Sequence, residues 1–259
     1  PEVVGERKIN ETQATIVLRP SFIPLVEFKK RRAPLEEALG AYITKIDGDR
    51  NRKWVEITYS RVPFSSFFEL SEGRTKQLNV SEFIVGENLE GQISSNLNES
   101  PHLMVAGETG GGKSTFLKQM ITSLYVNDPT VQLYLIDLKG GLEFNAFRNL
   151  PRVSVLGNIE DAINALKDIP DIINKRAKLL KAAGKASIAG MEAEFPRYVV
   201  VLDEAAEFFL ASGGTLNDRD VGREILSRVA RQGRSLGIHL VVATQRPDSR
   251  ALVPQIKAN

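Results

Sequence analysis

What this sequence lacks narrows the classes of protein that it can encode. It has no cysteine in 259 residues, which excludes disulfides and thiolate metal sites and suits a cytosolic protein. No apolar run reaches the roughly 18 residues needed to cross a bilayer, and no secretory signal opens the chain. The formal net charge is only +2, so any nucleic-acid surface has to be a local patch. We therefore expect a soluble, cytoplasmic globular protein.

Length and composition allow one large domain or two smaller ones. A hydrophobic content of 42% is enough for a real core. The chain begins at Pro1 without an initiator methionine and stops after Asn259. We expect it to be a fragment, with room for a membrane anchor or another domain beyond its ends.

The pattern of apolar residues predicts two regions. Residues 1–95 contain short alternating runs at 15–18, 54–59 and 83–85 that resemble strands, with one short helix at 34–39. This region is predicted to be a small β-rich or α+β accessory domain.

Residues 96–259 show buried strands alternating with helices. This alternation predicts a parallel sheet covered on both faces. Helical spacing is present over 159–180, where Pro170 should kink or divide the helix, and over the arginine-rich stretch 220–236. The predicted strands are residues 103–106, 131–138, 198–202 and 238–243.

A glycine-rich string follows the first of these strands. Residues 107–114 read GETGGGKS and satisfy G-x-x-x-x-G-K-[ST], before a predicted helix over 114–124. Glycines let backbone N–H groups surround phosphates, Lys113 would reach the β- and γ-phosphates, and Ser114 would hold Mg²⁺. A chance glycine-rich turn is disfavoured by this strand and helix context. The predicted nucleotide-binding residues are Gly107, Glu108, Thr109, Gly110, Gly111, Gly112, Lys113, Ser114 and Thr115.

An acidic pair, Asp203 and Glu204, closes the run 198–202. Carboxylates at the end of a buried strand are costly unless they meet a cation or take part in proton transfer. Asp203 is suited to holding the metal through water, and Glu204 to being the base that polarises the attacking water. A helix N-cap is the alternative for Asp203, but the phosphate loop upstream disfavours it. Ser114 and Asp203 are the predicted metal ligands.

Gln245 follows the last predicted strand. Its amide could hydrogen-bond the γ-phosphate or the attacking water, but from the residues alone a polar exit from the strand explains it equally well. Residues 137–140 match the D-x-x-G motif of GTPases. However, residues 174–177 read NKRA and lack the aspartate of a guanine-specific N-K-x-D. The predicted nucleotide is therefore ATP.

Several linked strings resemble the FtsK/SpoIIIE family of RecA-like motor ATPases, over roughly residues 100–259. They are SPHLMVAG at 100–107, LIDLKGG at 135–141, SLGIHLVVATQRP at 235–247 and IKAN at 256–259. The resemblance implies a RecA-like P-loop (ASCE) parallel sheet flanked by helices. In that sheet the strand of Gln245 lies between the phosphate-loop strand and the strand of Asp203. The N-terminal region matches only weakly, as an accessory domain preceding the motor core.

The resemblance also implies roles for residues that the motifs leave open. It makes Gln245 a sensor residue. It also implies that the subunits form a ring, usually a homo-hexamer, with ATP bound between neighbouring subunits. A cation from the neighbouring subunit then stabilises transition-state charge. Arg228 and Arg234 best match family arginines, with Arg231 as an extra candidate, although a solvated basic helix face explains any single one equally well.

Other features have simpler explanations. His102 and His239 have no metal-like partners at a sensible spacing, so packing or backbone hydrogen bonding is expected for both. The basic run at 29–32 is expected to be a solvated loop, although it could touch phosphates or anionic lipid.

The favoured function is an ATP-driven ring motor that translocates double-stranded DNA in chromosome segregation or conjugative transfer. It would act in the bacterial cytoplasm, on its own or as the cytoplasmic part of a membrane-anchored protein. One alternative is the ATPase of a type VII-like secretion system, with a secreted protein as substrate. A second alternative is a nucleotide-binding assembly module with little turnover, against which intact Lys113, Ser114, Asp203 and Glu204 argue.

Overall fold

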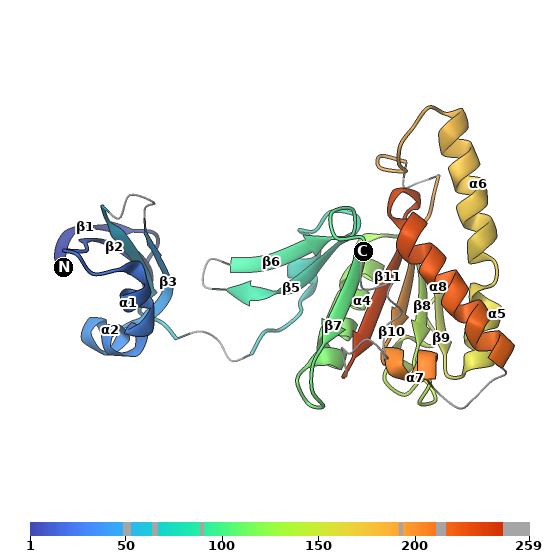
Figure 1. Cartoon of the computed structure of the whole chain (residues 1–259), viewed down its shortest axis with the longest axis horizontal. Helices are drawn as coiled ribbons and strands as arrows, with labels where there is room; N and C mark the ends of the chain where they lie inside the picture. Colours follow the sequence, from blue (N-terminus) through green and yellow to red (C-terminus); the bar gives the residue numbers. More distant parts are fainter. Residues whose placement is uncertain (49–52, 64–66, 89–90, 192–193, 211–215, 246–259) are drawn as a thin grey trace. The chain divides into compact units, whose positions relative to one another are not determined.

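The computed structural model describes residues 1–48, 53–63, 67–88, 91–191, 194–210 and 216–245. The chain divides into two compact units (Figure 1). The first comprises residues 1–69 and 86–93, and the second comprises 70–85 and the chain from Ser94 onward. No helix within the described ranges is long and apolar enough to cross a membrane.

The first unit is a four-stranded antiparallel sheet with two short helices. Its strands are β1 (Glu2–Lys8), β2 (Gln13–Arg19), β3 (Tyr42–Gly48) and β4 (Val55–Ser60), in the order β1-β2-β4-β3. Helices α1 (Leu25–Lys30) and α2 (Arg32–Leu39) connect β2 to β3. Its small core consists of Leu18, Phe28, Ile43, Val55 and Ile57. The predicted strands at 15–18 and 54–59 and the helix at 34–39 are confirmed.

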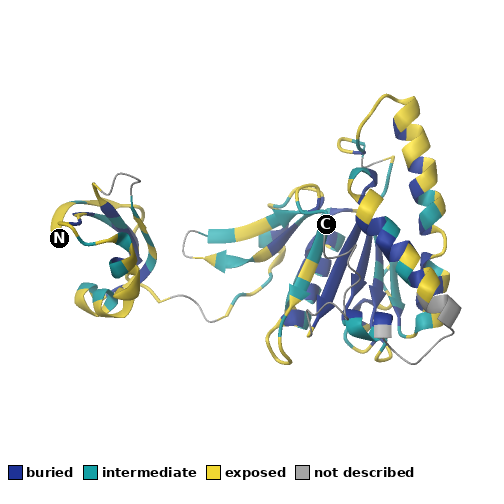
Figure 2. Ribbon diagram, viewed as in Figure 1, coloured by how far each residue is buried: buried dark blue, intermediate teal, exposed yellow. Residues whose placement is uncertain are grey.

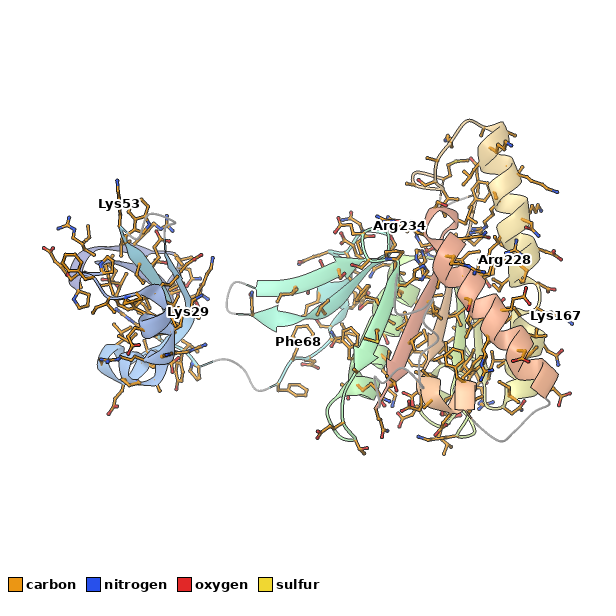
Figure 3. The ribbon with its side chains drawn as sticks, in the orientation of Figure 1. Lys29, Lys53, Phe68, Lys167, Arg228 and Arg234 are labelled. Carbon is orange, nitrogen blue, oxygen red and sulfur yellow. The ribbon has the colours of Figure 1, made fainter. Side chains whose placement is uncertain are left out.

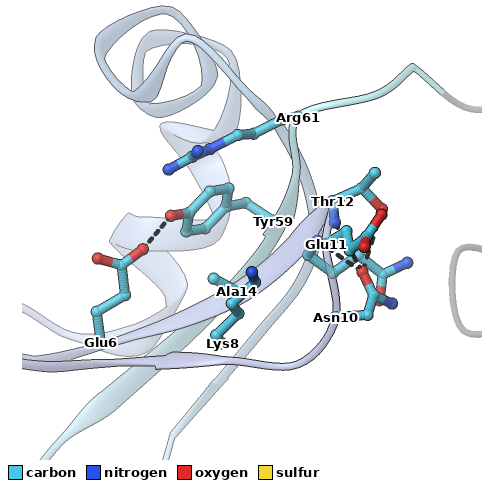
Figure 4. Close-up of a pocket in the computed structure, with 9 residues that line it drawn as sticks. Glu6, Lys8, Asn10, Glu11, Thr12, Ala14, Tyr59 and Arg61 are labelled. Carbon is cyan, nitrogen blue, oxygen red and sulfur yellow. Dashed lines mark hydrogen bonds between the residues drawn. The ribbon is translucent and has the colours of Figure 1, made fainter.

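Figure 4 shows a pocket beside the β1–β2 turn of this unit. The Asn10 side chain accepts from the backbone N–H groups of Thr12 and Gln13, both at 2.9 Å, and so fixes the turn. The Tyr59 hydroxyl donates to the Glu6 carboxylate, and this hydrogen bond raises the pKa of Tyr59.

The basic run at 29–32 is helical except at the turn residue Arg31, rather than a solvated loop. It covers the end of α1 and the start of α2. Arg31 pairs with Glu27 at 2.9 Å and Arg32 pairs with Glu36 at 3.1 Å, each four residues apart along the chain. Such pairs support short helices, and here the charges of both arginines are paired with carboxylates of this helical segment.

The second unit is built around a five-stranded parallel sheet. Its strands are β7 (His102–Ala106), β8 (Gln132–Ile136), β9 (Val153–Leu156), β10 (Tyr198–Leu202) and β11 (Ile238–Thr244), in the order β7-β11-β10-β8-β9. Strand β11 therefore lies between β7 and β10, as the family resemblance implies. Because all five strands are parallel, the segments that follow β7, β8, β10 and β11 meet at one edge of the sheet.

Helices cover both faces of this sheet (Figures 1 and 2). Val199, Val201, Val241 and Ala243 pack with α4 (Lys113–Asn127) on one face. Val200, Leu202, Leu240 and Val242 pack on the other face, since successive side chains of a strand point to opposite sides. The second face is covered by α5 (Ile159–Leu166), α6 (Ile169–Ala182), α7 (Ala205–Leu210) and α8 (Leu216–Leu236). The predicted RecA-like fold class is confirmed.

Two local features follow from single residue types. The helical stretch 159–180 divides into α5 and α6, and Pro170 lies in the first turn of α6, where its missing N–H is not needed. Asn158 caps α5 by accepting from the backbone N–H of Asp161 at 2.9 Å. The structure adds strand β9, which the sequence pattern does not predict because its four residues carry only a short apolar pattern.

The segment 70–85 packs with the second unit, although the sequence pattern predicts one boundary near residue 95. It contains α3 (Glu72–Thr75) and the start of β5 (Glu82–Asn88), which pairs with β6 (Gly91–Asn96). Phe83 and Ile84 are buried, and Phe83 belongs to the core around α4. The backbone of Ile84 also accepts from Gln119 at 3.0 Å, which ties this segment to α4.

Candidate nucleotide-binding site

The predicted phosphate loop connects β7 to α4. Gly110 and Gly112 have φ angles of 80° and 85°, in the left-handed region that side chains other than glycine rarely adopt. A turn closes the loop where the backbone N–H of Gly111 donates to the carbonyl of Glu108 at 3.0 Å. Helix α4 begins at Lys113 and has no side-chain cap, so its first N–H groups are available to an anion. Ser114 is half-buried in this first turn and Thr115 is exposed.

Lys113 links the phosphate loop to the acidic pair. Its side chain is buried, and its ammonium donates to the backbone carbonyl of Asp203 at 3.0 Å. The same ammonium lies 3.7 Å from the Glu204 carboxylate. The structure thus brings together three residues that lie up to 91 positions apart in the sequence.

Glu204 has both carboxylate oxygens engaged. Oε1 accepts from the Thr244 hydroxyl at 2.7 Å and Oε2 from the backbone N–H of Gln245 at 3.0 Å. Burial by itself would raise the pKa of Glu204, but hydrogen bonds from Thr244, Gln245 and Ala206 and the charge of Lys113 together lower it. The side chain is therefore ionised at neutral pH and held in one orientation.

Gln245 reaches the phosphate loop from the end of β11. Its amide oxygen accepts from the Thr109 hydroxyl at 3.1 Å, while its backbone N–H contacts Glu204. The backbone N–H of Gly107 also donates to the carbonyl of Thr244 at 3.3 Å. The end of β11 therefore contacts both the phosphate loop and the acidic pair.

Asp203 has properties that suit a ligand of a metal ion. It is buried, its Oδ1 atom has no hydrogen-bond partner among the described residues, and burial raises its pKa. The described residues contain no cluster of three or more His, Asp or Glu that could form a complete metal cage. That combination fits Mg²⁺, which proteins usually hold with one or two side chains together with substrate phosphates and water.

Sequence reasoning missed several residues around this site. The sequence motifs assign no role to Thr244, although a hydroxyl on the last residue of a buried strand is a signal for one. Asp137, from the D-x-x-G match, accepts from the backbone N–H groups of Lys139 and Glu143, both at 3.0 Å, and so shapes its own loop. Lys139 pairs with Glu207 of α7 at 3.1 Å, and its charge acts on both Asp203 and Glu204.

The arginines of α8 lie elsewhere in the unit (Figure 3). Arg228 is half-buried and donates to Asn174 of α6 and to Gln232. Arg234 is exposed in the last turn of α8, and its charge acts on His102 at the amino end of β7. Because the phosphate loop follows the carboxyl end of β7, neither arginine is placed to serve the site of its own chain.

Both histidines are structural. The backbone N–H of Leu240 donates to His102 Nδ1 at 3.1 Å, and His239 Nδ1 lies 3.0 Å from the carbonyl oxygen of Pro101. Burial lowers the pKa of His102 to about 4 and that of His239 to about 3, so both are neutral at pH 7.

Comparison with known proteins agrees with this geometry. The model of the FtsK/SpoIIIE family matches residues 73–210 and 190–249. The chain belongs to the FtsK/SpoIIIE family. The match begins at residue 73, and so includes the segment that packs against α4.

Two FtsK/SpoIIIE relatives have the name DNA translocase FtsK. The protein of Staphylococcus epidermidis strain ATCC 35984 is 30% identical over 229 residues, which cover 81% of this chain and 28% of the relative. That of Lactococcus lactis subsp. cremoris is 30% identical over 225 residues, 79% of this chain and 29% of the relative. The chain therefore spans less than a third of the length of these relatives.

Two solved structures extend the comparison. The pCW3 conjugation coupling protein TcpA, in a monomer form with ATPγS, has a TM-score of 0.68 at 28% identity, over 98% of this chain and 73% of that one. The cytoplasmic domain of the type VII secretion ATPase EccC of Thermomonospora curvata has a TM-score of 0.55 at 27% identity, over 70% of this chain and 23% of that one. Family membership and the nucleotide-bound relative support the assignment as an ATP-binding motor ATPase.

Proposed function

We propose that this chain contains the ATP-hydrolysing core of a ring-forming motor that translocates double-stranded DNA. The observation that carries the proposal is the convergence of Lys113, Asp203, Glu204 and Gln245 at one edge of the sheet, in a chain of the FtsK/SpoIIIE family.

Each residue then has a defined task in hydrolysis. The phosphate loop and the start of α4 bind the phosphates through backbone N–H groups, and Lys113 neutralises their charge. Ser114 and Asp203 would hold Mg²⁺, which supplies further neutralisation of the charge that develops on the phosphates. Glu204, ionised and fixed by its hydrogen bonds, orients and polarises the attacking water. Gln245 senses the γ-phosphate and transmits its presence to Glu204 and Thr109, the two residues that it contacts.

Assembly into a ring, most simply a homo-hexamer, would complete this site. Within one chain no cation other than Lys113 and Lys139 is placed near the acidic pair by the contacts of the described residues. Arg228 or Arg234 of a neighbouring subunit would supply the additional positive charge. ATP binding is then a property of the single chain, whereas efficient hydrolysis needs the assembly.

Two observations favour DNA over a protein substrate. The relatives at 30% identity are named DNA translocases, and the coupling-protein likeness includes the first unit, because it covers 98% of this chain. The likeness to the secretion ATPase covers only 70% of the chain. Transport of a secreted protein remains the second candidate, because that ATPase shares the core at 27% identity.

The ATPase rate with and without long double-stranded DNA, at two salt concentrations, tests the proposal. We expect Mg²⁺-dependent hydrolysis that DNA stimulates, with DNA binding that weakens steeply as salt increases. Absence of both stimulation and salt-sensitive binding in the assembled protein would exclude the translocase. A secreted-protein extract that stimulates hydrolysis when DNA does not would favour the second candidate.

A Glu204→Gln variant tests the catalytic assignment separately. The amide can still accept from Gln245 through its oxygen and donate to the Thr244 hydroxyl, so the fold and ATP binding are expected to survive. Turnover should fall by about two to four orders of magnitude, the usual contribution of a positioned base. Hydrolysis at the wild-type rate would remove Glu204 from this role.

A further inference from the structure

The C-terminal parts of α6 and α8 carry positive charge without any negative charge. Residues 172–191 contain five lysines and arginines, residues 225–239 contain three, and neither stretch contains an aspartate or glutamate. In the whole chain the two signs are nearly balanced, at 34 and 32. Helix α6 packs beside α8 (Figure 1).

Part of this charge is a row of exposed lysines on α6 and just after it. We define the lysine row as Lys175, Lys178, Lys181 and Lys185, all of which are exposed. Residues three apart on a helix differ by about 60° around the axis and about 4.5 Å along it, so Lys175, Lys178 and Lys181 follow one side of α6, and Lys185 comes just after its end. The opposite side, with Ile169, Ile173 and Leu180, is buried in the core (Figure 2).

The fold itself does not account for the lysine row. None of its members pairs with a carboxylate among the described residues, whereas Arg31, Arg32 and Lys139 do. The helix dipole favours cations only in the last turn, which includes Lys181 but neither Lys175 nor Lys178. Like charges at this spacing destabilise a helix by about 0.2–0.5 kcal/mol per pair.

The row lies near the amino ends of the sheet strands, whereas the phosphate loop of the same chain lies at their carboxyl ends. Arg176, between the lysines, donates to the carbonyl of Leu236 at 2.6 Å, and the backbone N–H of Ile188 donates to Ser235 at 3.0 Å. Both carbonyls precede β11, so they mark its amino end, whereas the phosphate loop follows the carboxyl end of β7. Substitutions in the row therefore leave the nucleotide site of the chain intact.

We propose that the lysine row binds the phosphate backbone of double-stranded DNA. The proposal rests on the proposed function, because it assigns part of the DNA surface of the motor. From Lys175 to Lys181 the row extends about 9 Å, which matches about three phosphates of one strand at 3.4 Å each. A membrane is disfavoured as the partner, because the apolar side of α6 is buried in the core and cannot insert between lipids.

Salt dependence of DNA binding tests the lysine row. The test variant is Lys175→Gln/Lys178→Gln/Lys181→Gln, in the full 259-residue chain, since glutamine matches lysine in helix propensity. The control is Lys29→Gln/Lys30→Gln/Lys167→Gln, which removes the same charge from exposed positions outside the row. Arg228 and Arg234 stay unchanged, because they are candidates for the hydrolysis step.

The logarithm of the affinity falls as the logarithm of the salt concentration rises, and each contributing lysine should make this slope steeper by about 0.9. We expect the test variant to lose about 2 to 3 from that slope and to bind at least about tenfold more weakly at 0.1 M salt. The control should keep the wild-type slope, and all three proteins should hydrolyse ATP equally without DNA.

Three results would overturn the inference. If the wild-type chain binds DNA and the test variant keeps its slope, the row is not the DNA surface, although the translocase proposal survives. If the wild-type chain does not bind DNA at all, both proposals fail. If the variant instead loses assembly in sedimentation measurements, or loses binding to phosphatidylserine vesicles that the wild type retains, the row serves another partner.

Discussion

The hydrogen bond from Thr244 to Glu204 offers a sharp test of the candidate site. Thr244 is fully buried, and its hydroxyl lies 2.7 Å from Oε1 of Glu204. A Thr244→Val substitution keeps the shape of the side chain and removes this donor. A hydrogen bond to a charged group contributes about 1.5–3 kcal/mol, and here it stabilises the ionised form of Glu204. Because this contact lowers the pKa of Glu204, its loss should raise that pKa.

The assay is the steady-state ATPase rate from pH 4 to 8 for the wild type, Thr244→Val and Thr244→Ser. The acid limb of kcat/KM should move to higher pH in the valine variant, because it reports the base of the free enzyme. At pH 8 its kcat should be about ten- to a hundredfold lower, because the carboxylate is less well fixed. The serine variant retains the hydroxyl and should match the wild type. Identical pH profiles and kcat values for all three proteins would refute the role of Glu204 as a base held by Thr244.

Other predictions concern charge, protonation and packing. Lys113→Ala should weaken ATP binding at least about a hundredfold without unfolding the chain, because it removes the cation beside the phosphate loop; unchanged titration with a fluorescent ATP analogue would contradict this. His239 has a pKa lowered from 6.5 to about 3, so its stabilising contribution is complete above pH 6.5 and is lost as the pH falls towards 3. Between pH 7 and pH 5, denaturant unfolding should show a loss about 2 kcal/mol smaller in His239→Gln than in the wild type, where His102 adds a loss of its own; equal losses in the two proteins would exclude His239 as a source. Arg176→Met should lower the unfolding free energy by about 2–4 kcal/mol, because the carbonyls of Leu236 and Pro196 lose their donors; equal urea midpoints would argue against it.

Local sequence patterns predict much of the secondary structure of the second unit. The phosphate loop could be assigned because its glycines, Lys113 and Ser114 are consecutive, and each residue type has a direct chemical reason. The apolar runs predicted β7, β8, β10 and β11, because strands buried on both faces leave a continuous signal. The division of the helix at Pro170 follows from the ring of that one residue.

Local patterns do not predict which distant segments of the chain contact one another. Phe83 and Ile84 looked like part of an N-terminal strand domain, and nothing nearby in the sequence shows that they pack on α4. The shape of the loop at 137–143 likewise depends on two backbone hydrogen bonds to Asp137, which a D-x-x-G match does not reveal.

The sequence by itself thus determined the chemistry of this protein, namely a phosphate loop, an acidic pair and a polar strand end on an α/β frame. Only the tertiary structure decided how they act together. Sheet order places Gln245 beside both Thr109 and Glu204, and the contacts of Thr244 and Lys113 set the protonation state of Glu204. The physical reason is that a residue type and its neighbours along the chain fix what a group can do. Its pKa and orientation depend on burial and partners that folding brings from as far as 138 positions away, as for His239 and Pro101.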